Sequence, residues 1–250
     1  MSSPNYHHLA HLKIPLKDII SATNNFAHNI SIREAGFGNH YKGKLMWSGE
    51  LIDIHAQRWN KEWDEKEQQF WMEIFMLSTL KHKNLVSLVG FCDENDEKII
   101  IIKRETRASL VNHLSDSKRL TWLRRLEICL GLAHALSYMH YDEQRDFSVI
   151  HRNIDSETVL LNDNWEPKLS EFRLSKKSKV SNTLGYTDPT YLETKSADHK
   201  SDMYSFGIVM FELLCAYDCL NEEQSERPNI DEIVTRLEKA LEHQLEHHNA

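Results

Sequence analysis

The sequence predicts a two-lobed α+β protein, in which a small antiparallel sheet with one helix precedes a mostly helical lobe. Two observations predict this class. Short runs of β-branched and aromatic residues surround one amphipathic stretch before residue 105, and longer stretches with helical periodicity dominate after residue 120. The chain has 250 residues, of which 40% are hydrophobic, so it is long enough to bury a sizeable core.

The first lobe is expected to begin with a short helix within residues 14–26, docked through its apolar side chains. Three stretches rich in β-branched and aromatic residues are expected to supply the strands: 30–58, 85–90 and 98–104. The turn signal Ser48-Gly49 predicts a hairpin inside the first of these stretches. Between the strands, residues 62–80 repeat apolar side chains every three or four positions, which indicates an amphipathic helix.

The second lobe is expected to hold three helices. Thr121 can cap the first of them, and Ser201 and Asn229 can cap the second and third. The predicted buried positions of the first helix are Trp122, Leu126, Cys129, Leu130, Ala133, Leu136 and Met139. Residues 142–174 are expected to be mostly loop. Short strands are predicted within this loop at 149–150 and 159–161.

Composition and charge exclude several classes of function. The formal net charge is −8 and the sequence holds no basic cluster, so nucleic acid is not an expected partner. No apolar run approaches the roughly 20 residues of a membrane-spanning helix, so no transmembrane segment is expected in this chain. The four cysteines lie in apolar stretches without metal-ligand spacing, which favours buried thiols, and no metal site is predicted.

Several short motifs occur in an order that is typical of one family. They lie at 22–26, 36–38 with 41–43, 80–86, 88–92, 151–152, 185–186 with 188–189, 200–207 and 227–228. Together they resemble the kinase domain of plant receptor-like protein kinases over nearly the whole chain. The resemblance implies a protein kinase-like fold with an N-lobe of about 26–103 and a C-lobe of about 104–250. Residues 1–25 are then a lead-in similar to a juxtamembrane segment.

Such a kinase uses a few charges to hold ATP, Mg²⁺ and the acceptor hydroxyl in line. The resemblance allows these positions to be compared one at a time. The glycine-rich loop is reduced to Gly36 and Gly38, because bulkier residues occupy its other glycine positions. The strand lysine that contacts the phosphates is replaced by Gln57 in the best register. A shift of one residue would offer Arg58 instead, whose planar fork differs from a compact ammonium group.

The helix carboxylate that pairs with this lysine in the family is retained as Glu73. In the catalytic loop, Asn153 occupies the position of the base, and an amide cannot take a proton at neutral pH. Asp155 replaces a lysine that neutralises phosphate, and Thr158 replaces an asparagine that binds metal. Glu171 replaces the metal-binding aspartate and carries one additional methylene group. By this comparison, the nucleotide and metal positions are degenerate.

Structural positions of the family are retained. Leu77, His151 and Phe172 correspond to a packed column that joins the lobes, and Asp202 corresponds to the anchor of the catalytic loop. The resemblance therefore implies a pseudokinase, in which the fold is kept and phosphoryl transfer is lost.

Two further departures from the family carry expectations. Arg173 replaces a glycine and is expected to turn into the vacated nucleotide pocket and pair with Glu73 or Asp155. The stretch between Cys215 and Arg227 is short for the family, which indicates a deletion in the C-lobe that would expose apolar surface.

Two functions stay open from the sequence. The first is a pseudokinase that serves as a signalling scaffold or regulator. Its expected partners are signalling proteins, with an active receptor kinase among the candidates, and it needs no cofactor. Its expected location is the cytoplasm, with recruitment by partners to the inner face of the plasma membrane as the further option. The second is a weakly active serine/threonine kinase that uses Arg58 and Glu171, with weak binding of ATP and Mg²⁺.

Overall fold

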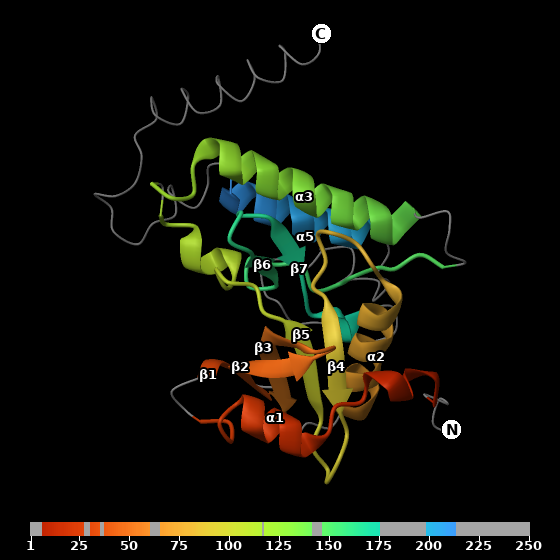
Figure 1. The fold of residues 1–250 in the computed structure, drawn as a ribbon. Helices are drawn as coiled ribbons and strands as arrows, with labels where there is room; N and C mark the ends of the chain where they lie inside the picture. The colour runs from red at the N-terminus through yellow and green to blue at the C-terminus, as the bar shows by residue number, and fades with distance from the viewer. Residues whose placement is uncertain are drawn as a thin grey trace, which may run out of the picture.

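The computed structural model describes residues 7–27, 31–35, 38–60, 66–116, 118–141, 147–175 and 199–213. Two lobes are visible in Figure 1. One contains a five-stranded sheet with two helices, and in the other the helices α3 and α5 run side by side. This arrangement confirms the predicted two-lobed α+β class.

The sheet of the first lobe is antiparallel throughout, in the order β1-β2-β3-β5-β4. Its strands are β1 (Ser31–Ala35), β2 (Gly38–Trp47), β3 (Glu50–Trp59), β4 (Leu88–Cys92) and β5 (Ile99–Lys103). The predicted hairpin joins β2 to β3. It forms because Ser48 and Gly49 both adopt positive φ angles, 50° and 86°, which suit a two-residue turn whose twist matches that of the strands.

Each face of the sheet is covered by a helix. On one face, α1 (Leu16–Ala22) buries Ile19 in a cluster with Ile54 and Ala56 of β3. On the other face, α2 (Lys66–Thr79) contributes Phe70 and Ile74 to the main core. Successive side chains of β3 therefore point alternately toward α1 and toward α2.

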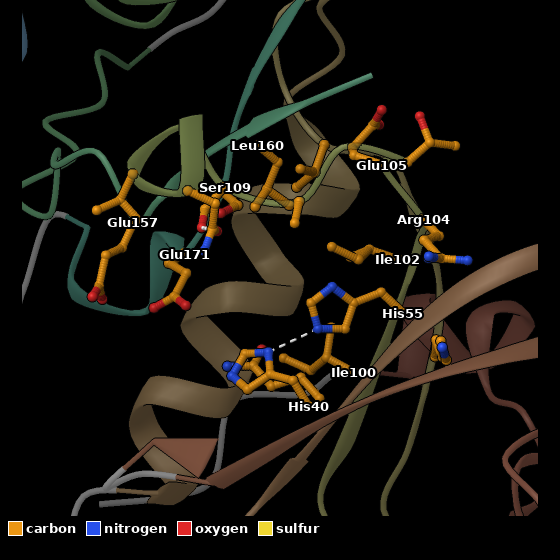
Figure 2. A pocket seen from close by; sticks show the side chains of 18 of the residues that line it. His40, His55, Ile100, Ile102, Arg104, Glu105, Ser109, Glu157, Leu160 and Glu171 are labelled. Atoms are coloured by element: carbon orange, nitrogen blue, oxygen red, sulfur yellow. Dashed lines mark hydrogen bonds between the residues drawn. The ribbon is translucent and has the colours of Figure 1, made fainter. Parts of the chain in front are cut away.

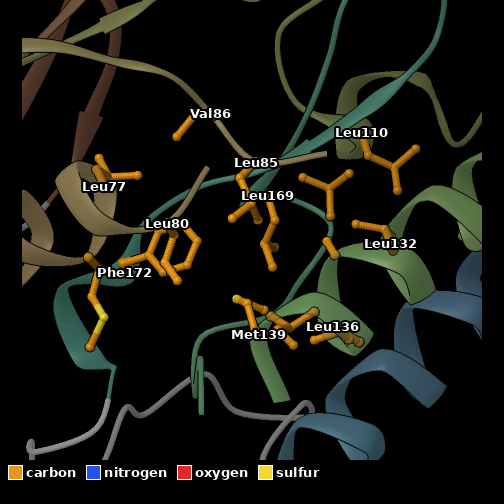
Figure 3. Close-up of a cluster of buried hydrophobic side chains, with 14 of the residues drawn as sticks. Leu77, Leu80, Leu85, Val86, Leu110, Leu132, Leu136, Met139, Leu169 and Phe172 are labelled. Carbon is orange, nitrogen blue, oxygen red and sulfur yellow. The ribbon is translucent and has the colours of Figure 1, made fainter. Parts of the chain in front are cut away.

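The second lobe is built from α3 (Trp122–Tyr141), the strands β6 (Val159–Leu161) and β7 (Pro167–Leu169), and α5 (His199–Phe211). Three short 3-10 helices complete the described elements: η1 (His7–Leu12), η3 (Leu110–His113) and η4 (Phe172–Leu174). One hydrophobic cluster extends through both lobes. Figure 3 shows Leu77 and Leu80 of the first lobe near Phe172, with Leu136 and Met139 of α3 in the same cluster. The two lobes therefore share one hydrophobic core.

The predicted buried face of α3 is confirmed at Cys129, Leu136 and Met139. Trp122, Leu126 and Ala133 are only partly buried, and Ile128, Leu132 and Ala135 are buried without having been predicted. Leu130 was expected inside but is 58% exposed, whereas Arg125 is buried. The guanidinium of Arg125 donates to the carbonyl oxygens of Leu120 and Leu213, at 3.0 and 2.7 Å. A guanidinium can satisfy several carbonyl groups at once, which explains why a charged side chain occupies this place.

Other differences are smaller. Helix α5 begins at His199, two residues before the predicted cap Ser201, and β6 pairs with β7, whose strand was not predicted. Within the described stretch 147–175, residues 149–150 form no strand. The predicted helix at Asn229 and the stretch after Cys215 lie outside the described residues, so the deletion stays a prediction. In the described part of the chain, no helix has both the length and the apolar character needed to span a membrane.

Two helical glycines offer a matched test of the packing between α3 and β7. A Cβ atom on Gly131 would lie 2.5 Å from the Pro167 side chain, whereas one on Gly207 would meet no described atom within 4 Å. We expect G131A to lower the free energy of unfolding by about 1–3 kcal/mol through overpacking. We expect G207A to raise it by up to about 1 kcal/mol through helix propensity. Denaturant melts measure both changes, and equal effects of the two substitutions would contradict this packing.

Candidate functional site

A cavity of about 460 Å³ opens between the sheet and the second lobe. Its wall combines apolar side chains, such as Val86, Ile100 and Leu160, with charged ones. The charged side chains that line it are Lys42, Glu73, Arg104, Glu105, Glu157 and Glu171. Figure 2 shows this cavity from close by. A hollow of this size and mixed polarity is typical of a small-molecule site.

The register of β3 decides which residue replaces the expected lysine. Gln57 is buried and lines the cavity. Arg58 is the next residue along the strand and points to the opposite face, where its guanidinium binds both carboxylate oxygens of Glu97 at 2.7 and 2.8 Å. The same guanidinium lies 4.4 Å from the centre of the Phe26 ring. Arg58 is therefore committed to the outer face of the sheet, and the amide of Gln57 occupies the inner position.

Gly36 and Gly38 are the two glycines predicted to remain of a phosphate-binding loop. Gly36 lies outside the described residues. Gly38 is the first residue of β2, and a Cβ atom there would collide with the carbonyl oxygen of Arg58 on β3. The close approach of these two strands therefore requires a glycine at this position, whether or not a ligand binds.

Glu73 projects from α2 into the back of the cavity, where it is almost fully buried. Its carboxylate accepts hydrogen bonds from the backbone N–H groups of Phe172 and Arg173. Burial disfavours the charged form and raises the pKa of Glu73 to about 7, although these hydrogen bonds and the nearby charge of Arg173 oppose the increase. The Glu73 carboxylate thus joins α2 to η4. Its partners are backbone N–H groups, whereas the resemblance assigns a lysine as its partner.

Arg173 pairs with Glu171, and not with either of the two carboxylates expected for it. Its guanidinium forms an ion pair with the Glu171 carboxylate, and both side chains are nearly buried, at 12% and 11% exposure. Arg173 also acts on the pKa of Glu73, which places its charge on that side of the site. Glu171 itself has a left-handed backbone with φ of 68°. The expected metal-binding carboxylate is therefore already neutralised by a neighbouring cation.

Three of the predicted site residues form a closed network within the catalytic loop. The Asp155 carboxylate accepts the backbone N–H groups of Glu157 and Thr158, both at 2.8 Å. The Thr158 hydroxyl lies 3.0 Å from the carbonyl oxygens of both Asn153 and Asp155. Asn153, Asp155 and Thr158 are all buried, and burial raises the pKa of Asp155. The Asp155 carboxylate and the Thr158 hydroxyl thus stabilise a turn of this loop. The resemblance implies that the family's residues at these two positions contact phosphate and metal instead.

Asp202 anchors this loop from α5, as the resemblance implies. It is fully buried and accepts three hydrogen bonds of 2.8 Å, from the His140 ring and from the backbone N–H groups of His151 and Arg152. The His151 ring donates to the Ser170 carbonyl at 3.1 Å and packs edge-on against Phe172, 4.6 Å between ring centres. Burial lowers the pKa of His151 to about 4, so this ring is neutral at physiological pH.

Sequence reasoning missed a pair of histidines in the cavity wall. His40 of β2 and His55 of β3 lie with Nδ1 and Nε2 2.8 Å apart, drawn as the dashed line in Figure 2. The signal for this pair was present in the hairpin. The Ser48-Gly49 turn places His40 opposite Gln57, so His55, two residues before Gln57, is a diagonal neighbour of His40 on the same face. A hydrogen bond between two imidazoles needs a neutral ring as its acceptor.

Comparison with known proteins agrees with the architecture. The protein kinase domain family matches residues 31–249. Three receptor-like protein kinases of Arabidopsis thaliana are similar to the chain. HERK 1 is 38% identical over 91% of this chain, ANXUR2 is 38% identical over 89%, and FERONIA is 36% identical over 82%. The matched regions are 27%, 28% and 24% of those proteins, so the chain spans about a quarter of their length.

The described residues do not fit the ATP and Mg²⁺ that this resemblance implies. An amide, Gln57, stands at the inner position, and the cationic side chains among the described lining residues are Lys42 on β2 and Arg104 after β5. The Glu171 carboxylate is paired with Arg173, and burial favours the neutral form of Glu73. Phosphates bound beside these carboxylates would meet an amide, and not an ammonium group, on β3.

The raised pKa of Glu73 predicts how stability depends on pH. Glu73 titrates near 4.5 in the unfolded chain and near 7 in the folded chain. Between these values the folded state holds the additional proton, so the contribution of Glu73 to the free energy of unfolding falls as the pH rises. It is fully lost above the folded pKa, and the total change is about 3 kcal/mol at most. E73Q cannot titrate, so the wild-type stability minus that of E73Q should fall across this window.

Urea denaturation at several pH values measures this difference. Glu127 is an exposed acid on α3, so E127Q is the matched control and should follow the wild type at every pH. A difference between wild type and E73Q that stays constant, or that grows with pH, would contradict the burial of a protonated Glu73.

Proposed function

The chain belongs to the protein kinase family, as a domain of the receptor-like kinase type, and we propose that it is a pseudokinase that regulates signalling through protein contacts. One observation carries the proposal. The amide of Gln57 lines the cavity at the position of the phosphate-binding lysine, and the Glu73 carboxylate is engaged by the backbone of η4. Phosphoryl transfer depends on positioned charge, and this site lacks the central charged pair.

The catalytic loop supports the same conclusion by a different route. Transfer requires a base near the acceptor hydroxyl, and the amide of Asn153 has no basic lone pair at neutral pH. Asp155 supplies negative charge where the family has a lysine, and its carboxylate is bound within the loop. Loss of one such group typically costs about 100-fold or more in rate. Losses at several positions together leave no measurable transfer.

The alternative function is a weakly active serine/threonine kinase that binds ATP. Two features that this alternative needs are engaged elsewhere: Arg58 binds Glu97 on the outer face of the sheet, and Glu171 binds Arg173. The alternative therefore requires both ion pairs to break before a nucleotide is held. The Arg58–Glu97 pair, with two hydrogen bonds of 2.7 and 2.8 Å, opposes this.

The proposed mode of action is that of a scaffold. The core that joins the lobes is intact, so the domain can present a kinase-shaped surface to signalling proteins without catalysis. The related proteins are named receptor-like kinases, and an active receptor kinase is the proposed partner. Contact with it would bring this domain to the inner face of the plasma membrane, while the domain itself resides in the cytoplasm.

We expect no phosphoryl transfer from ATP by the purified chain. With radiolabelled ATP and Mg²⁺, incorporation into the chain itself or into a generic acceptor protein should equal a blank without protein, because the base and the phosphate-binding lysine are both replaced. An active receptor-like kinase domain is the positive control. Incorporation that requires Mg²⁺ and disappears in E171Q would show that the alternative function is correct.

We further expect that restoring the family's residues will not restore activity. The sixfold variant carries Gln57→Lys, Asn153→Asp, Asp155→Lys, Thr158→Asn, Glu171→Asp and Arg173→Gly. It removes the hydrogen bonds that Asp155 and the Thr158 hydroxyl make in the catalytic loop, at about 1 kcal/mol each. Thermal melts and label incorporation measure the outcome.

The matched control for this variant keeps Asp155 and Thr158 and carries only the other four substitutions. We expect the control to melt several degrees above the sixfold variant, because the turn in the loop survives. A sixfold variant that melts with the control and incorporates label well above the blank would overturn this prediction.

A further inference from the structure

Basic side chains gather where the loop after α2 meets α3 and β7. Burial lowers the pKa of His82 in this loop, and the positive charges of Lys83, His134 and Lys168 lower it further. These three groups therefore lie near the His82 ring, one in the same loop, one on α3 and one on β7. Lys81 precedes His82 in the chain. We call the five residues the basic patch.

The loop that carries the patch is fixed on two sides. On the α3 side, the Lys81 backbone N–H donates to the Tyr138 hydroxyl at 3.0 Å, and the Tyr138 ring stacks on His82 with 5.1 Å between ring centres. On the other side, the N–H of Leu169 in β7 donates to the Asn84 carbonyl at 2.9 Å. The loop backbone is therefore already ordered, which reduces the cost of binding a ligand there.

The charges of the patch are not used in ion pairs. In the part of the chain that the structure describes, none of the five side chains has a carboxylate oxygen within 4.0 Å. The ammonium groups of Lys81 and Lys168 donate to the backbone carbonyls of Leu77 and Lys83, so both keep their charge. The Lys83 side chain is exposed. Other lysines form ion pairs with carboxylates, namely Lys13, Lys44 and Lys98.

Two acids lie on the Lys168 side of the patch. The charge of Lys168 acts on the pKa of Glu105, which lines the cavity between the lobes. Glu166 is two residues before Lys168 and accepts a hydrogen bond from the Asn162 amide at 2.7 Å. The charges that act on His82 are all positive. An anion is therefore favoured on the side of His82 and Lys83.

His82 offers a hydrogen-bond donor at this place. The backbone N–H of Asn84 donates to its Nδ1 at 3.2 Å, so the neutral ring carries its proton on Nε2. No described group accepts a hydrogen bond from Nε2, and this atom is not buried, so a ligand can reach it. An N–H donor beside the Lys83 ammonium group suits the oxygens of a phosphate.

The charge of the whole chain favours a small anionic group over a large anionic surface. The formal net charge is −8. A bilayer or a nucleic acid extends well beyond the screening length of about 8 Å at physiological salt, so it would meet the negative potential of the rest of the molecule. A single phosphate on a peptide meets mainly the local positive potential. The patch therefore fits a phosphorylated peptide.

We propose that the basic patch binds a phosphorylated segment of a signalling protein, with the phosphate held between the Lys83 ammonium group and the Nε2–H of His82. This inference rests on the proposed function, which gives the domain a protein partner, and it adds the chemistry that recognises this partner. The patch carries no part of the kinase chemistry discussed above.

Three peptides that differ at one position test the proposal. They are acetyl-Gly-Ala-X-Ala-Gly-amide with phosphoserine, glutamate or serine at X, titrated into the ¹⁵N-labelled whole chain at pH 7. We expect the phosphoserine peptide to shift the backbone amide signals of residues 81–85 saturably, with a Kd of about 0.1–2 mM. The glutamate peptide should bind about 3-fold or more weakly, since it carries less charge on fewer oxygens, and the serine peptide should shift nothing.

Either of two results would overturn the proposal. One is equal binding of the phosphoserine peptide and either of the other two. The other is the absence of any shift with the phosphoserine peptide up to about 5 mM.

A matched pair of variants locates the phosphate. Lys83 and Lys17 are both exposed, and neither forms an ion pair with a described residue, so K83Q and K17Q remove the same charge from different places. K83Q should weaken binding of the phosphoserine peptide by about 3- to 5-fold, and K17Q should bind as the wild type does. Equal affinities of the two variants would refute the proposed contact.

Two further measurements separate this inference from its rivals. Binding to vesicles of phosphatidylcholine with about 30% phosphatidylserine that K83Q abolishes would assign the patch to a membrane and overturn the proposal. The test is also distinct from that of the proposed function. Label incorporation from ATP decides whether the chain is a pseudokinase, whereas the peptide titration decides only what the patch binds.

Discussion

The carboxylate of Glu73 and the backbone N–H groups of Phe172 and Arg173 form the contact on which the site depends. Helix α2 must be held against the second lobe, and a buried carboxylate needs hydrogen-bond donors wherever it lies. With Gln57 on β3 there is no ammonium group at that position to supply them. The donors come from η4 instead, so the placement of α2 does not require a cation on β3. Helix α2 thus keeps its place, although β3 lacks the lysine charge that the family uses to bind phosphate.

The catalytic loop is held in part by contacts of residues outside the degenerate positions. Asp202 secures the catalytic loop through His140 and two backbone N–H groups, and His151 packs against Phe172 beneath the cleft. Asp155 also takes part, because its carboxylate stabilises the turn of that loop. A residue that replaces a catalytic lysine thereby contributes to structure. Under the proposed function, the fold would persist without the chemistry because these contacts do not depend on phosphoryl transfer.

Much of the fold could be predicted from the sequence, because local rules determine it. The Ser48-Gly49 turn fixed the hairpin register, and that register placed Gln57 toward the cleft. Long-range partners could not be predicted in the same way. Arg125 is buried because it meets the carbonyl of Leu213 at the end of another helix, and Arg173 selects Glu171 from several nearby carboxylates. Such choices depend on tertiary geometry, which periodicity and spacing do not encode.

The central claim is that the chain keeps a kinase fold without a working site for ATP and Mg²⁺. Calorimetric titration of the intact chain with ATP, in the presence and in the absence of Mg²⁺, tests it most directly. The account predicts no saturable heat that depends on Mg²⁺ up to about 1 mM ATP, because Glu171 is paired with Arg173, burial favours the neutral form of Glu73, and no ammonium group faces them from β3. Saturable binding in the micromolar range that requires Mg²⁺ would contradict it.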